Sequence, residues 1–115
     1  MTTQSKALGN GLENRVVTWA RRLGLTAARQ PGSGVFADFP NDVTIQLPDG
    51  ETLLVECKVR SVPPSFAVLL GWLARVTANA KAAGYGAAIL VFNQKGSRKP
   101  KVLLDLDTFL RLVTK

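Results

Sequence analysis

The sequence predicts an α/β fold in which helices flank one small, mixed β-sheet. Segments with apolar residues at helical spacing alternate with shorter segments in which apolar and polar residues alternate, in the order α-β-β-β-α-β-β-α. The chain has 115 residues, of which 46% are apolar and 20% are charged, enough to bury one core. We therefore expect residues 1–115 to form a single domain.

The first expected element is a helix over about residues 8–23. Its apolar residues fall on one face, namely Leu12, Val16, Val17, Ala20 and Leu23. Gly24 is a typical stop signal. Glu13 lies inside the apolar stripe, so we expect its carboxylate on the core side; the alternative is that it lies at the edge of the stripe and reaches solvent.

Three strands are expected next, over residues 26–30, 42–47 and 51–59, and the PGSG segment at 31–34 is typical of a loop. Residues 48–50, Pro-Asp-Gly, fit a three-residue hairpin loop with glycine in the left-handed position. Counting outward from that loop, Asp42 lies opposite Glu56, and Lys58 shares their face. A two-residue loop would set apolar residues against polar ones, so the longer loop is favoured.

The second half of the chain predicts a helix, two strands and a short helix, over residues 65–83, 87–92, 101–106 and 108–113. Ser65 is the expected N-cap of the long helix, and Gly84 its stop signal. The unbroken apolar run at 87–92 predicts a strand that is buried on both faces. Asp107 is the expected N-cap of the last helix.

The charge balance favours a polyanionic partner. Fifteen Lys and Arg residues against eight Asp and Glu residues give a net charge of +7, so nucleic acid is the first candidate and an inert basic surface is the alternative. Residues 35–56 hold five of the eight acidic residues and no basic one. An acidic segment in a basic chain suits a divalent cation held next to a phosphate backbone.

Several classes of chemistry are excluded by composition. The chain has no histidine and one cysteine, Cys57, which excludes a Ser/His/Asp triad, a Cys/His pair, the usual zinc sites and an intrachain disulfide. The N-terminal segment lacks the apolar region of a signal peptide, and no apolar stretch reaches membrane-spanning length. We therefore expect a soluble, cytoplasmic protein.

The predicted register implies a metal. Asp42 and Glu56 would repel each other unless a cation lies between them, and oxygen ligands suit Mg²⁺ or Mn²⁺. Lys58 would hold a water or a phosphate oxygen beside that ion, which fits metal-assisted phosphodiester hydrolysis. The alternative is a Glu56–Lys58 pair on a solvated strand face, with Asp42 beside it.

These residues carry a resemblance to a known family. The ordered set consists of Glu13, Arg29, the loop Gly32-Ser33-Gly34, Asp42 and Glu56-Cys57-Lys58. It resembles the PD-(D/E)XK nuclease superfamily and, within it, the archaeal-type Holliday junction resolvases, including their phage-borne relatives. GNGLENR at 9–15 resembles that family's glycine-led helix, and LLVECK at 53–58 resembles its metal-site strand. The resemblance covers about residues 9–60 and implies a restriction-endonuclease-like fold.

The sequence departs from the family pattern at one position. Asn41, and not proline, precedes Asp42. A literal Pro48-Asp49 lies at the hairpin tip, but at about 3.3 Å per residue Asp49 is over about 20 Å along the strand from Glu56, too far to share an ion. We therefore assign the aspartate to Asp42, with Asp38 as the fallback.

The resemblance also implies roles for individual residues. Asp42, Glu56 and the backbone carbonyl of Cys57 would bind the metal, Lys58 would orient or activate the attacking water, and Glu13 would complete the site directly or through water. Arg29 would bind a phosphate and Ser33 would touch the DNA backbone; the alternatives are a surface strand residue and an ordinary loop serine. Further expected DNA contacts are Arg15, Lys95, Arg98 and Lys99, although a charge run is often only solvated.

The expected function is a magnesium-dependent, structure-specific endonuclease that resolves four-way DNA junctions. Two symmetric nicks imply a homodimer, with the long helix around Leu69, Trp72 and Leu73 or the sheet edge as its interface. Trp19 and Trp72 are expected in the core or the interface and less so in base stacking. The alternatives are a nuclease for other branched, single-stranded or duplex DNA, a nucleic-acid binding module without activity, and a basic domain that binds a protein.

Overall fold

The computed structural model describes residues 2–29 and 42–114 of the chain. Within these ranges it has three helices and five strands in the predicted order, which confirms the α/β fold class. The elements are α1 (Thr2–Arg22), β1 (Thr26–Arg29), β2 (Asp42–Gln46), β3 (Thr52–Arg60), α2 (Phe66–Ala82), β4 (Ala87–Gln94), β5 (Lys101–Leu103) and α3 (Leu106–Val113).

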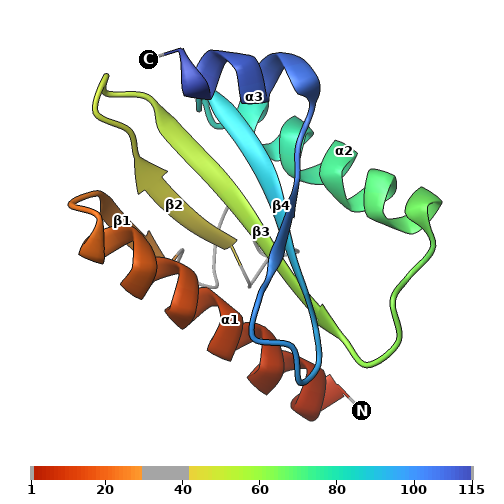
Figure 1. Ribbon diagram of the computed structural model, residues 1–115. Helices are drawn as coiled ribbons and strands as arrows, with labels where there is room; N and C mark the ends of the chain where they lie inside the picture. Colours follow the sequence, from red (N-terminus) through yellow and green to blue (C-terminus); the bar gives the residue numbers. More distant parts are fainter. Residues whose placement is uncertain (1, 30–41, 115) are drawn as a thin grey trace.

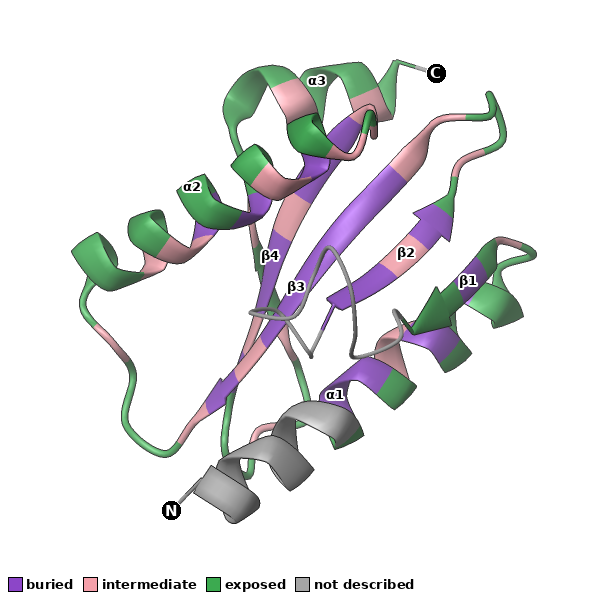
Figure 2. Cartoon of the chain, turned by 180° about the vertical axis from the view of Figure 1, so that it is seen from behind, coloured by how far each residue is buried: buried purple, intermediate pink, exposed green. Residues whose placement is uncertain are grey.

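The five strands form one mixed sheet in the order β1-β2-β3-β4-β5. β3 and β4 are parallel, and the other neighbouring strands are antiparallel. α1 and α2 lie on opposite sides of this sheet (Figure 1), each over its own group of buried side chains. Burial is concentrated on the central strands (Figure 2), as expected where both faces of a sheet are covered.

The β2–β3 hairpin has the predicted register. Asp42 pairs with Glu56, and the backbone N–H of Leu47 donates to the carbonyl oxygen of Glu51 at 2.8 Å. Gly50 has a φ of 93°, a left-handed conformation that glycine adopts without a steric penalty. The turn chemistry therefore sets which residues of the two strands face each other.

Local signals also set most helix ends. The Ser65 side chain accepts a hydrogen bond from the Val68 backbone N–H, so Ser65 is the N-cap of α2 as predicted. Gly84 and Gly24 follow their helices with positive φ values. α1 begins at Thr2, earlier than the expected residue 8, because no proline or glycine interrupts residues 2–7 and extending a formed helix is easy.

The C-terminal boundaries differ from the prediction. β5 ends at Leu103, and α3 begins at Leu106 with Asp105 as its N-cap, so the assignment of Asp107 as the cap is wrong. Asp105 has the extended backbone of a capping residue, with φ −69° and ψ 147°. Asp107 lies in the first turn, where its Oδ1 accepts from the Thr108 backbone N–H and its charge suits the helix dipole.

In the described part of the chain, none of the helices combines the length and the apolar character needed to cross a membrane.

Candidate functional site

Three carboxylates are buried and lie close enough to one another to influence each other's charge. Asp42 is the first residue of β2, Glu56 lies opposite it in the middle of β3, and Glu13 comes from α1. Their exposed fractions are 0%, 1% and 0%. The solvated alternatives for Glu13 and for the strand pair are therefore wrong.

The carboxylates reach these positions through the apolar residues beside them. Val43 and Val55, the next pair in the register, are fully buried in the core under α1. Leu12, which precedes Glu13, belongs to the same core. Packing of these neighbours fixes the elements and forces the carboxylates out of water.

Several oxygens of these buried carboxylates lack a partner. Among the described residues, none donates a hydrogen bond to either oxygen of Asp42, to Oε2 of Glu56 or to Oε2 of Glu13. An unpartnered buried carboxylate is costly, so it must take up a proton or hold a cation. Oxygen donors of this kind fit Mg²⁺ or Mn²⁺.

The protonation of these groups reflects the same cost. Burial raises the pKa of Asp42 to about 9, and the neighbouring Glu56 carboxylate adds to the effect. Burial also raises the pKa of Glu13 to about 7, although the charge of Arg29 opposes it. Without a cation, the site therefore carries less negative charge at neutral pH than its three carboxylates suggest.

Glu13 forms an ion pair with Arg29, the residue predicted to bind a phosphate. The Nε of Arg29 donates to Oε1 of Glu13 at 2.9 Å, and its Nη1 donates to Oδ1 of Asn14 at 3.4 Å. The Arg29 side chain is 42% exposed while Glu13 is fully buried. Arg29 thus presents a cation at the surface directly beside the buried site.

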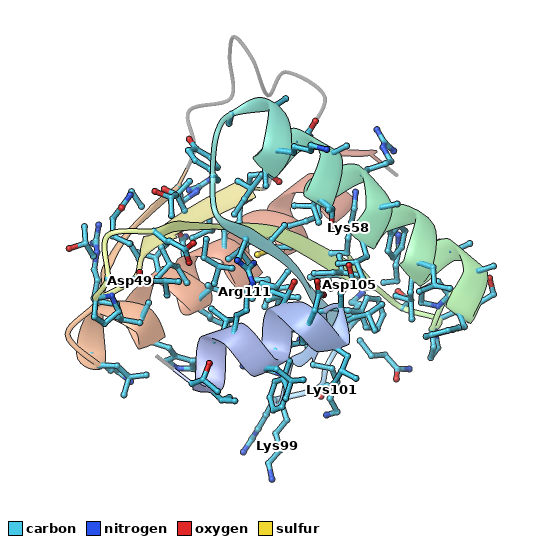
Figure 3. All side chains as sticks on the ribbon, turned by 90° about the horizontal axis from the view of Figure 1, so that it is seen from above. Asp49, Lys58, Lys99, Lys101, Asp105 and Arg111 are labelled. Carbon is cyan, nitrogen blue, oxygen red and sulfur yellow. The ribbon has the colours of Figure 1, made fainter. Side chains whose placement is uncertain are left out.

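Lys58 lies next to Glu56 on the other side of the sheet from α1. Its Nζ is 3.5 Å from Oε1 of Glu56, and its side chain is 21% exposed. The same Nζ lies 5.3 Å from the centre of the Trp72 ring in α2. Figure 3 shows Lys58 pointing toward α2. The lysine is therefore held at the border between the buried carboxylate and solvent.

The structure brings together only part of the predicted ligand set. Within residues 2–29 and 42–114, no three His, Cys, Asp or Glu side chains are grouped as a complete metal site. Glu13 is engaged by Arg29, which leaves Asp42 and Glu56 as the facing pair. A metal bound there would need further ligands from backbone, water or substrate.

Cys57 would contribute by its backbone alone. Its thiol is fully buried in the core under α1, and burial raises its pKa well above the usual value. A neutral, buried thiol is a poor ligand for Mg²⁺, which prefers oxygen. The Cys57 thiol is therefore not a candidate ligand for such an ion.

The basic residues of α1 and the β4–β5 loop come together in space. The Nη2 of Arg15 donates to the carbonyl oxygen of Arg98 at 3.0 Å, and the guanidinium lies 5.0 Å from the centre of the Trp19 ring. Arg15 and Lys95 also line one cavity of about 270 Å³. Lys99 follows in the same loop and is exposed (Figure 3). Ser33 and Asp38 lie outside the described residues.

Sequence reasoning missed Arg60 as a candidate and left Trp72 to the core or an interface. The guanidinium of Arg60 lies 5.0 Å from the centre of the Trp72 ring, which Lys58 also contacts. The available signal was spacing, because residues 56, 58 and 60 share one face of a strand.

No model of a known protein family and no curated protein sequence matches the chain.

Proposed function

We propose that this protein is a magnesium-dependent endonuclease that cleaves branched DNA, with four-way junctions as its main substrate. The observation that carries the proposal is the buried pair of Asp42 and Glu56: both carboxylates have unpartnered oxygens, and the ammonium group of Lys58 lies 3.5 Å from the other Glu56 oxygen, Oε1. In a chain with a net charge of +7, this acidic centre is surrounded by groups that attract phosphate.

The chain's own residues divide the work of phosphodiester hydrolysis. Asp42, Glu56 and the backbone carbonyl of Cys57 would hold Mg²⁺, and their oxygens match its preference. When bound, the ion supplies Lewis-acid stabilisation of the charge that builds on the phosphoryl oxygens. Lys58 would hydrogen-bond the attacking water or a phosphoryl oxygen through Nζ. Arg29, oriented by Glu13, would bind a phosphate through its exposed edge.

The hydrolysis is balanced without a further reactant. The water oxygen forms a bond to phosphorus, and the bond between phosphorus and one sugar oxygen breaks. One water proton leaves for solvent or a nearby base, and the departing oxygen takes up a proton. Removing the carboxylates that would hold Mg²⁺ would abolish the reaction even where the fold persists, because no ion would then stabilise the charge on the phosphoryl oxygens.

The preference for a junction rests on symmetry and on charge. One chain has one such pair of carboxylates in its described part, whereas resolving a four-way junction takes two symmetric nicks. A two-fold dimer places two sites in matching positions on the two-fold symmetric substrate. The Arg15 side chain and the loop at 95–99 form a basic surface that fits the backbone of a duplex arm.

The test is cleavage of a labelled four-way junction and of a matched linear duplex, with Mg²⁺ or with EDTA. We expect paired nicks on the junction that disappear with EDTA and in Glu56→Gln. Glu51→Gln is the matched control, because Glu51 is partly exposed and lies at the hairpin end of β3. Equal cutting of both substrates would indicate a general nuclease. Tight binding without metal-dependent cutting would leave a binding module.

A further inference from the structure

One aromatic ring of α2 supports two cations of β3. The Nζ of Lys58 and the guanidinium carbon of Arg60 lie 5.3 Å and 5.0 Å from the centre of the Trp72 ring. Both distances are in the range of cation–π attraction. Lys58 and Arg60 are two residues apart on a strand, so they project from the same face of the sheet, and Glu56 precedes them on that face.

The burial along this row changes in one direction. Glu56 is buried, whereas Lys58 and Arg60 are partly exposed. At about 3.3 Å per residue, the three positions follow one another at steps of about 7 Å. The row therefore leads from the proposed metal site to the surface and places two positive charges next to each other along that path.

Arg60 has no acidic partner that would neutralise it. In the portion of the chain described, no carboxylate forms an ion pair with Arg60, and its one hydrogen bond is from Nη1 to the carbonyl oxygen of Val59 at 2.8 Å. A guanidinium has five N–H donors, so most of the donors of Arg60 make no hydrogen bond with the described residues. Two adjacent cations repel each other unless an anion lies near them.

We infer that Arg60 binds the DNA phosphate next to the one held at Lys58, and that Trp72 is the positioning residue for both cations. This inference rests on the proposed nuclease function. Trp72 presents the face of its ring to both side chains, which restricts their rotamers before DNA arrives. Arg60 acts in binding, and Trp72 acts through Lys58 and Arg60 without touching the reacting atoms.

Trp72 also packs against the core under α2, so its loss can destabilise the fold. Two variants separate this packing from positioning. Trp72→Phe keeps an aromatic face of smaller size, and Trp72→Leu keeps apolar volume without that face. If Trp72 only packs the core, the two variants should bind and cleave DNA equally well under conditions in which both are fully folded. If Trp72 positions the two cations, Trp72→Phe should bind and cleave better than Trp72→Leu.

The first measurement is binding of a four-way junction in EDTA over a range of salt concentrations. We expect Arg60→Gln to weaken binding about tenfold and to reduce the salt slope by about 1, the value for one lost phosphate contact. Arg22→Gln is the matched control, since Arg22 is an exposed arginine in the last turn of α1. In saturating single-turnover reactions, Arg60→Gln retains its rate, whereas Trp72→Leu lowers both binding and rate.

The second measurement reports on position without DNA or metal. In protein labelled with ¹³C at the lysine side-chain carbons, the Lys58 signal is expected upfield because it lies over the Trp72 ring, with Lys58→Arg identifying the signal. That shift should persist in Trp72→Phe and disappear in Trp72→Leu. Absence of the shift in the wild type would overturn the positioning role.

The outcomes separate this inference from the proposed function. Metal-dependent junction cleavage by the wild type, with Arg60→Gln and Trp72→Leu behaving like Arg22→Gln, would overturn this inference and leave the nuclease. A wild-type protein that neither binds nor cuts DNA would overturn both. A salt slope reduced by about 1 in Arg60→Gln, together with better binding and cleavage by Trp72→Phe than by Trp72→Leu, would support the inference.

Discussion

Asp42 pairs with Glu56 in a position where water cannot solvate either carboxylate. The sequence set this pairing through a hairpin loop, but alternation alone left open whether the shared face was solvated. The structure answers that both side chains are buried and that both Asp42 oxygens lack a donor among the described residues. Such a residue lowers stability on its own, and residues that break the rules of stable packing are expected at functional sites.

The raised pKa values predict how stability depends on pH. For Asp42 the folded-state pKa of about 9 exceeds the ordinary value of 3.8, so the folded state binds the proton more tightly than the unfolded state. The contribution of Asp42 to the free energy of unfolding is complete below about pH 4 and is lost as pH rises toward 9. The contribution of Glu13 is lost as pH rises toward about 7. We expect the metal-free protein to be less stable at pH 8 than at pH 5 in urea unfolding, by about 4 kcal/mol from Asp42 alone, since each of the three pH units contributes about 1.4 kcal/mol.

Asp42→Asn supplies the control for this pH dependence. The neutral amide removes the buried charge, so the variant should be more stable than the wild type at pH 8 without metal and should lose most of the slope. Asp49→Asn, at the exposed hairpin tip, should leave the slope unchanged. Mg²⁺ should raise the Tm of the wild type at pH 8 and not that of Asp42→Asn. Wild-type stability that rises between pH 5 and 8 would contradict the expectation.

The β2–β3 hairpin is the element that positions the site, and its loop depends on one glycine. Gly50 has a φ of 93°, whereas Gly71 lies inside α2; an added Cβ would meet no atom within 4 Å at either position. Gly50→Ala should therefore destabilise by about 1 kcal/mol through backbone strain. Gly71→Ala should stabilise by roughly 0.5–1 kcal/mol through helix propensity. Thermal unfolding of both variants is the check, and equal signs would refute the strain argument.

α2 shows how one helix serves both packing and the site. Leu73 and Val76 are buried against the sheet, so Leu73 is part of this chain's own core. Trp72, one position away, lies at the edge of this core and contacts the two cations of β3. The apolar stripe alone could not distinguish these roles, because both place a residue on the inner side of the helix.

The proposed dimer makes a prediction about the whole molecule. A mixed dimer of wild type and Glu56→Gln would hold one active site, so it should nick one strand of a junction where the wild-type dimer makes paired cuts. The substrate is a supercoiled plasmid with a cruciform, from which paired cuts give linear DNA and a single nick gives a nicked circle. As more variant is added, the products should shift from linear DNA to nicked circles. Linear product that falls only by dilution of the wild type would favour independent monomers.

The sequence by itself determined the features that depend on neighbours along the chain. These are the order of helices and strands, the turn at residues 48–50, the pairing of Asp42 with Glu56 and the Ser65 cap. Each follows from dihedral preferences, turn chemistry or side-chain periodicity, which act over a few residues.

Only the tertiary structure decided the environment of the candidate site. The burial of Glu13, its pairing with Arg29, and the contacts of Lys58 and Arg60 with Trp72 join separate elements. Periodicity gives the face on which a residue lies, whereas its neighbours and its access to water are set when the helices pack on the sheet. Burial and electrostatics are sums over those long-range neighbours, so no local pattern determines them.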